Sequence, residues 1–141
     1  MSADALEQLV TRDAGLLAVS AIGQDMRDLL SPQAAPEARE AVDLYCYIAR
    51  KHMGALAAVL NGLDTLVFTG GIGEHAPAIR QRICAGLTHL GIDLDTDANT
   101  ANRAVISRPG PVTVRVMQTD EDLVIARHVQ RLLSLTPEGE G

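Results

Sequence analysis

The stretch LVFTGGIGEHAPAIRQ, residues 66–81, constrains the fold more than any other part of the chain. It opens with a short apolar run, residues 66–68, of the kind that forms a strand covered on both faces in a parallel sheet. Three glycines follow: Gly70, Gly71 and Gly73. A helix is predicted from Pro77, because proline suits the first helical position, with a buried side made of Ile79, Ile83, Leu87 and Leu90. A strand, a glycine turn and a helix in this order indicate an α/β fold.

The glycine turn also indicates a kind of ligand. A turn between a strand and a helix exposes backbone N–H groups near the positive end of the helix dipole, and both attract an anion. Glycine has no Cβ, so a phosphate or a nucleoside can approach the backbone, and glycine also adopts positive φ at low cost. The turn therefore predicts a site that holds a nucleotide rather than one that breaks a bond. A tight connection without any ligand is the alternative.

The turn departs from one known phosphate-binding motif and matches another. Glu74 and His75 follow Gly73 where a P-loop needs a lysine and a Ser or Thr, so a P-loop is excluded. Residues 71–76, GIGEHA, match the dinucleotide-binding pattern, and Asp93 stands about 20 residues further on. That acid should end a second strand, however, and residues 92–94 form a weak strand candidate. A dinucleotide-binding domain of an oxidoreductase is therefore a second hypothesis.

The N-terminal half of the chain is predicted to be helical. Residues 2–11 indicate a short helix with Ser2 as its cap. Residues 37–60 carry the strongest helical periodicity, and Asn61 and Gly62 end it.

The C-terminal part is predicted to contain a strand and a last helix. Residues 112–117 alternate as a strand does, with valines on one face, and a third strand is suggested over residues 104–106. Thr119 precedes Asp122 by three residues in a capping-box pattern. The helix that follows has an apolar face made of Ile125, Val129, Leu132 and Leu133. Residues 134–141 are expected to be frayed.

The composition excludes several classes of function. Aromatic residues make up 2% of the chain and its net charge is −6, which leaves neither stacking platforms nor a basic stripe for nucleic acid. No apolar run is long enough to span a membrane, and acidic residues stand where a secretory signal would be basic. Cys46 and Cys84 are interpreted as buried thiols of a reduced, cytoplasmic protein. The histidines show no zinc-ligand spacing with them.

Four segments taken together resemble the C-terminal part of the acetate kinases. They are residues 65–83, TLVFTGGIGEHAPAIRQRI, residues 87–95, LTHLGIDLD, residues 112–133, VTVRVMQTDEDLVIARHVQRLL, and residues 20–30, SAIGQDMRDLL. The resemblance covers nearly the whole chain in the right order, and propionate and butyrate kinases share these segments. It implies part of the actin-like ATPase fold, which is ribonuclease H-like: a nucleotide-binding lobe whose few-stranded sheet is flanked by helices.

The resemblance implies a role for particular residues. The floor under the adenine and ribose of ATP or ADP would be formed by Gly70, Gly71, Ile72, Gly73 and Glu74. The opposite side of the nucleoside would face Asp25, Met26 and Arg27. Glu121 falls at the family's magnesium-associated glutamate, and Mg²⁺ is expected there with the nucleotide phosphates. The residues alone leave another explanation, since acids in the first turn of a helix are favoured by its dipole. His75 stands where the family often has asparagine.

The resemblance also implies what lies outside this chain. The family's acetate pocket and phosphoryl-gripping residues come from an N-terminal half, and nothing in residues 1–14 corresponds to it. We therefore expect residues 1–141 to be the adenosine-binding lobe of an enzyme that converts ATP and acetate to ADP and acetyl phosphate. Alone, the lobe is expected to bind nucleotide weakly and to form a homodimer without turnover. A non-catalytic interaction module is the third hypothesis.

Overall fold

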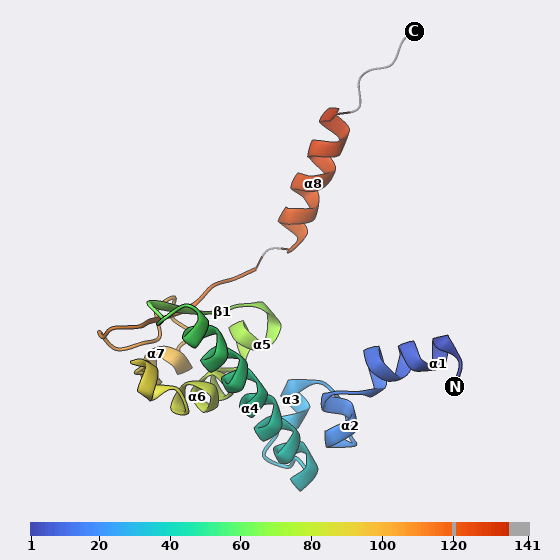
Figure 1. Cartoon of the computed structure of the whole chain (residues 1–141), viewed down its shortest axis with the longest axis horizontal. Helices are drawn as coiled ribbons and strands as arrows, with labels where there is room; N and C mark the ends of the chain where they lie inside the picture. The colour runs from blue at the N-terminus through green and yellow to red at the C-terminus, as the bar shows by residue number, and fades with distance from the viewer. Residues whose placement is uncertain (120, 136–141) are drawn as a thin grey trace.

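The computed structural model describes residues 1–119 and 121–135, which form an α/β arrangement (Figure 1). Among these residues the sheet has two parallel strands, β1 (Thr65–Phe68) and β2 (Thr113–Val116). The register pairs Thr65 with Thr113 and Phe68 with Val116. Parallel neighbours need a long crossover, and residues 69–112 provide it.

Helices make up most of the remaining described chain. In order they are α1 (Ala3–Gln8), the π-helical turn η1 (Leu9–Asp13), α2 (Leu16–Ser20), α3 (Met26–Leu29), α4 (Pro36–Val59), α5 (Gly70–His75), α6 (Pro77–Ala85), the 3₁₀ turn η2 (Thr88–Leu90), α7 (Thr96–Thr100) and α8 (Glu121–Leu135).

The core lies where α4 and α6 pack together against the sheet. Its buried side chains on these elements are Ala38, Val42, Cys46, Phe68, Ile79, Ile83, Cys84 and Val114. Small residues on α4 let its backbone approach its neighbours closely. Both cysteines are buried free thiols, as the sequence predicted, and burial raises the pKa of Cys84 to about 12.

Several predicted elements are confirmed with small shifts at their ends. The helix predicted over residues 37–60 is α4, and the helix predicted from Pro77 is α6. Because α6 ends at Ala85, Leu87 and Leu90 of its predicted buried side lie beyond it, at the 3₁₀ turn η2. The Ser2 hydroxyl caps α1 by accepting a hydrogen bond from the Ala5 amide at 3.2 Å. The α-helix expected over residues 2–11 ends earlier, at Gln8, where the π-helical turn takes over. Helix α8 extends to Leu135, two residues into the tail expected to fray, and residues 136–141 lie outside the described chain.

The third strand suggested over residues 104–106 is reduced to a single antiparallel bridge. Val105 pairs with Arg115 of β2. The Ile106 amide donates to the Val114 carbonyl at 2.9 Å, and the Val116 amide donates to the Ala104 carbonyl at 3.1 Å. Residues 104–106 therefore extend the sheet locally without forming a full strand.

The open glycine turn is the main correction to the predicted fold. Residues 70–75 are wound into α5, because Gly70 at φ +71° redirects the chain after the extended Thr69. Helix α5 is followed directly by α6, which begins at Pro77. The glycines therefore belong to a short helix that packs on α6.

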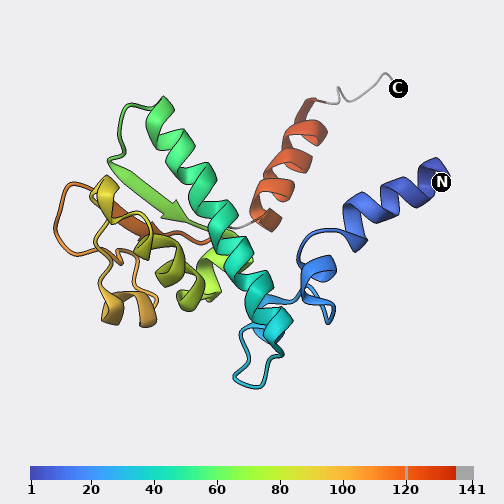
Figure 2. The same ribbon diagram turned by 60° about the horizontal axis from the view of Figure 1, so that its bottom comes forward.

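The two ends of the chain extend away from this body. Figures 1 and 2 show α8 and α1 projecting from it, and in Figure 1 the two helices point in different directions. The apolar face predicted for α8 is at the surface of this chain, since Ile125, Val129, Leu132 and Leu133 are all exposed. Within residues 1–119 and 121–135, no helix combines the length and the apolarity needed to cross a bilayer.

Candidate functional site

A cavity of about 460 Å³ lies between the start of α3 and helix α5. One side is formed by Gln24, Asp25, Met26, Arg27 and Leu30, and the other by Gly71, Ile72, His75 and Ala76. Five predicted site residues therefore line one cavity: Asp25, Met26, Arg27, Gly71 and Ile72. Three others do not line it, and these are Gly70, Gly73 and Glu74.

The α3 side of the cavity is fixed by a cap and by two buried side chains. The Asp25 carboxylate accepts a hydrogen bond from the Arg27 amide at 2.9 Å, which caps α3. Met26 and Leu29 are buried and attach this short helix to the core. The sequence D-M-R-D-L thus places its apolar residues inward and its charged residues toward the solvent and the cavity.

An ion pair stands at the mouth of the cavity. The Arg27 guanidinium donates to both carboxylate oxygens of Asp25, and its shortest contact is 2.6 Å. These side-chain hydrogen bonds are the main reason why the pKa of Asp25 falls to about 2. The Arg27 side chain is 90% exposed, so the pair leaves a cation accessible to a ligand.

The three glycines of α5 are needed for three different reasons. Gly70 has φ +71°, a left-handed conformation that other residues adopt only with strain. A Cβ on Gly73 would lie 3.2 Å from the backbone carbonyl carbon of Phe68, so glycine there lets α5 pack on β1. A Cβ on Gly71 would meet nothing within 4 Å, and the backbone φ there is ordinary. Nothing in the described fold requires glycine at residue 71, which faces the cavity.

Glu74 does not line the cavity, and its side chain joins two parts of the chain. Its Oε1 accepts hydrogen bonds from the Gly70 amide, the Thr119 amide and the Thr119 hydroxyl, each at 2.9 Å. The hydrogen bonds from Thr119 are the leading cause that lowers the pKa of Glu74. The Thr119 hydroxyl, expected to cap α8, therefore bonds to Glu74.

Sequence analysis missed Arg80, a fully buried arginine that holds the other end of α5. Its guanidinium donates to the carbonyls of Gly73 and Glu74 at 2.8 and 2.9 Å. It also donates to the side-chain and backbone oxygens of Asn99 at 2.7 and 2.9 Å. A signal was present, because Arg80 lies four residues from both Ala76 and Cys84 on the apolar side of α6. No comparable pattern marks Asn99.

The position of the predicted magnesium ligand, the Glu121 carboxylate, is not described by the structure. Glu121 is the first residue of α8, but its side chain is outside the described part of the structure. Among the residues that are described, no three His, Cys, Asp or Glu side chains gather in a way that could hold a metal ion.

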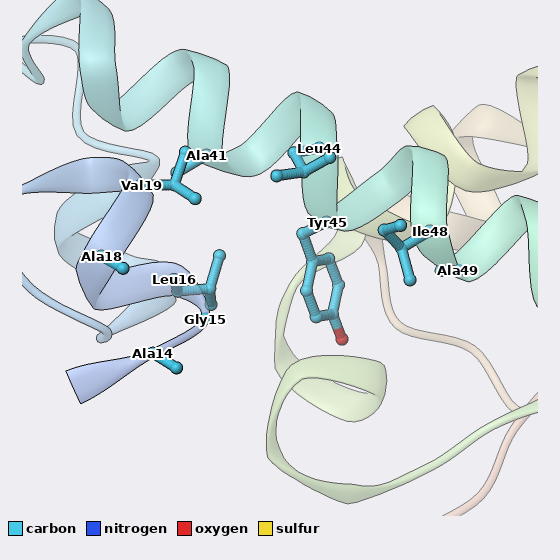
Figure 3. A pocket seen from close by; sticks show the side chains of 10 residues that line it. All are labelled: Ala14, Gly15, Leu16, Ala18, Val19, Ala41, Leu44, Tyr45, Ile48 and Ala49. Carbon is cyan, nitrogen blue, oxygen red and sulfur yellow. The ribbon is translucent and has the colours of Figure 1, made fainter. Parts of the chain in front are cut away.

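A second cavity, of about 420 Å³, is unsuited to a phosphate-bearing ligand. It lies between residues 14–19 and α4 (Figure 3). Its lining consists of alanine, glycine, valine, leucine and isoleucine, with Tyr45 as the one residue that carries a polar group. Burying a charged phosphate there would cost its hydration without a compensating cation.

The dinucleotide-binding hypothesis is not supported by the structure. Asp93 precedes Leu94, whose bridge to Ser107 is antiparallel, and β1 pairs in parallel with β2. The acid therefore does not end a parallel strand next to β1. Asp93 is exposed and approaches the Arg108 guanidinium at 3.9 Å.

Comparisons of the sequence with known proteins all indicate the same family. Residues 1–127 match the acetokinase family. The acetate kinase of Rhodopseudomonas palustris (strain TIE-1) is 50% identical over 135 residues, which cover 94% of this chain and 34% of that protein. For the acetate kinase of Thermosynechococcus vestitus the identity is 44% over 135 residues, covering 92% of this chain and 32% of the relative.

Solved structures show the same relationship. The crystal structure of Porphyromonas gingivalis acetate kinase superposes with a TM-score of 0.83 at 34% identity, covering 94% of this chain and 35% of the other. A propionate kinase from Francisella tularensis gives a TM-score of 0.81 at 30% identity, with coverages of 90% and 33%. This chain thus spans about a third of the length of its relatives, and the expected fold class is confirmed. The chain belongs to the acetokinase family.

Proposed function

We propose that this chain binds the adenosine part of ATP or ADP in the cavity between α3 and α5. We further propose that it forms the nucleotide-binding half of a phosphotransferase that converts ATP and acetate to ADP and acetyl phosphate. Family membership and relatives named acetate kinase support this reaction. One similar structure is named a propionate kinase, so the acceptor class is acetate or another short-chain carboxylate.

The observation that carries the proposal is the open space beside Gly71. The other two glycines of α5 have reasons within the fold, namely a positive φ and contact with Phe68. Gly71 has neither, and its backbone borders the cavity. A bare backbone facing an open space suits the flat face of a nucleoside. The remaining proposed contacts along the cavity are Asp25, Met26, Arg27 and Ile72. Gly70, Gly73 and Glu74 do not line it, and we propose that they act indirectly, by shaping helix α5.

The chemistry of the cavity suits phosphate as well as adenosine. The accessible Arg27 guanidinium can pair with a phosphate oxygen, and Met26 and Ile72 supply apolar contacts for a purine. We place no acyl-binding role on residues of this chain, and we propose that residues 1–141 alone bind nucleotide without turnover. Acetyl phosphate formed by the pure chain would contradict this part of the proposal.

We propose Glu121 as the protein contact for Mg²⁺. Mg²⁺ keeps several water ligands and binds through one or two carboxylates together with substrate phosphates, so a single glutamate is sufficient. The ion would neutralise phosphate charge during transfer. The Glu121→Gln variant should remove most of the Mg²⁺ dependence of ADP binding measured by calorimetry. The matched control is Glu40→Gln, which neutralises an exposed glutamate on α4. Equal Mg²⁺ dependence in Glu121→Gln and the wild type would contradict the assignment.

The nucleotide site is tested by adding a methyl group to Gly71. Gly71→Ala should lower ADP affinity about tenfold or more, equivalent to about 1.4 kcal/mol, because the added Cβ occupies the space of the ligand. The melting temperature should stay at the wild-type value or rise, since that Cβ meets no atom of the fold within 4 Å and alanine favours a helix more than glycine does. The control is Gly54→Ala on α4, where the Cβ also meets nothing within 4 Å but lies away from this cavity. Wild-type ADP affinity in Gly71→Ala would overturn the proposal, and absence of ADP binding by the wild type would favour a non-catalytic interaction module.

The expected homodimer and cytoplasmic location belong to the same proposal. Exposed apolar side chains on α8, including Val124, Ile125 and Leu133, support self-association. Two buried free thiols suit a reducing compartment. Light scattering that shows a monomer across the micromolar range would contradict the homodimer.

A further inference from the structure

Glu74 is the residue through which α5 contacts the segment that leads into α8. A single carboxylate oxygen, Oε1, accepts from the Gly70 amide at the start of α5 and from both the amide and the hydroxyl of Thr119. Glu74 and Thr119 are 45 residues apart in sequence. Only 7% of Glu74 is exposed, whereas Thr119 is at the surface, so these hydrogen bonds are partly shielded from water.

The two segments joined by Glu74 have different surroundings. Helix α5 borders the nucleotide cavity through Gly71 and Ile72. Thr119 lies two residues before α8, which projects from the body in Figures 1 and 2. One other described hydrogen bond fixes this approach, from the Met117 amide to the Phe68 carbonyl at 2.9 Å. The contacts that fix the direction of the chain after β2 are therefore made with α5, which also borders the cavity, and with the end of β1.

We propose that Glu74 is a positioning residue that couples occupation of the cavity to the placement of α8. The inference rests on the proposed nucleotide site and goes beyond it. A ligand against Gly71 orders α5. It thereby fixes the Glu74 carboxylate, which accepts a hydrogen bond from the Gly70 amide of the same helix. Fixing that carboxylate fixes Thr119 in turn. By reciprocity, loss of the contact with Thr119 weakens nucleotide binding.

A merely structural role for Glu74 makes a different prediction. If Glu74 only stabilises the fold, its removal lowers stability and leaves no specific communication between nucleotide and Thr119. If it couples the two regions, ADP protects the Thr119 amide from hydrogen exchange in the wild type. That ADP-dependent protection then disappears when the carboxylate or the hydroxyl is altered.

The experiment measures amide exchange by NMR on the full chain, with and without ADP, together with calorimetric ADP titrations. In the wild type, ADP should slow exchange at Thr119 about tenfold, the effect of one strengthened hydrogen bond to a charged acceptor. Thr119→Val removes the hydroxyl donor and should abolish most of this protection, and Thr119→Ser should restore it. Glu74→Gln should speed exchange at both Gly70 and Thr119 without nucleotide and should weaken ADP binding several-fold. Glu40→Gln, on exposed α4 surface, is the control and should match the wild type.

The outcomes separate the inference from the function on which it rests. Absence of ADP binding in the wild-type titration refutes the proposed function, and the coupling falls with it. Wild-type ADP binding without any change at Thr119 refutes the coupling and leaves the nucleotide site standing. Equal ADP protection in the wild type and Thr119→Val refutes it as well. If Glu74→Gln fails to fold, the Thr119 pair still decides, because those variants keep the Glu74 carboxylate and its bond to Gly70.

Discussion

Both strands of the sheet lead into a helix, but the two helices are fixed to very different degrees. Helix α5, after β1, is short and rich in glycine, and its ends are held by the buried Arg80 and Glu74. Helix α8, after β2, is longer and strongly amphipathic, yet its apolar side chains are exposed along the part of the chain that the structure describes. A helix-forming sequence therefore decides whether a helix forms, and partners elsewhere in the fold decide where it lies.

Helix α5 would be unstable by itself. Six residues with three glycines are too few and too flexible to hold a helix in water. An anion at its N–H end and a cation at its carbonyl end match the helix dipole and satisfy its terminal groups. Polar contacts from Glu74 within the helix and from Arg80 in the next helix thus give the cavity a helical wall where local preference alone would not.

The largest effect expected is the loss of Arg80. Arg80→Met keeps much of the volume but removes the arginine donor from the carbonyls of Gly73 and Glu74 and from the side-chain oxygen of Asn99, which should cost about 3–5 kcal/mol in the free energy of unfolding. The control on the same helix is Arg82→Met, whose partly exposed ion pair with Asp43 should contribute less than about 1 kcal/mol. Urea denaturation followed by circular dichroism measures both. Equal stability of the two variants would break the comparison, because α5 would then not depend on its buried cation.

The next effect contrasts a core helix with the projecting one. Ile83→Ala on α6 removes a side chain that is 3% exposed and should cost about 2–4 kcal/mol. Ile125→Ala on α8 makes the same chemical change where the residue is 61% exposed, and it should cost less than about 0.5 kcal/mol. The same urea experiment applies at low protein concentration. A large loss for Ile125→Ala would mean that α8 is packed in solution, and a loss that grows with concentration would assign that packing to self-association.

The smallest effect concerns the acid dependence of the link between the two regions. Hydrogen bonds from Thr119 and from the Gly70 amide, together with the electrostatic interaction with nearby His75, favour the ionised form of Glu74, so its pKa in the folded chain lies below the ordinary value of 4.5. A lowered pKa means that the stabilisation is fully present above pH 4.5 and is lost as the pH falls through the lower, folded value. An NMR titration of the Glu74 carboxyl should show this midpoint. Thr119→Val should move it up toward 4.5, and an unchanged midpoint would show that the Thr119 hydroxyl does not contribute to the shift.

Local patterns in the sequence predicted α4, α6, both strands and the presence of a helix after β2. Periodicity and capping act within a few residues of each other, so those elements could be recognised without knowing the fold. Residues 25–27 were assigned to the opposite side of the site by resemblance to acetate kinases, and in the structure they line one cavity with Gly71 and Ile72. Whether these residues contact a nucleotide stays a prediction.

The contacts that shape the cavity could not be predicted, because they join residues far apart in sequence. Glu74 was expected to serve the ligand, but its carboxylate is turned toward Thr119, 45 residues away. Arg80 acts through Asn99, 19 residues away, and through backbone carbonyls that carry no sequence signature. The glycine segment was expected to be a turn. Its helical form was missed because that form depends on these contacts, which the local sequence does not reveal.

Because Cys46 and Cys84 are buried, the rate at which a reagent labels their thiols reports how often the core between α4 and α6 opens. Alkylating reagents react with the thiolate, and the Cys84 thiol, with a pKa of about 12, is almost entirely protonated at neutral pH as well as shielded. Modification must therefore wait until α4 and α6 separate. The rate of thiol labelling follows how often that happens, without an added probe, and a ligand that tightens the body will slow it.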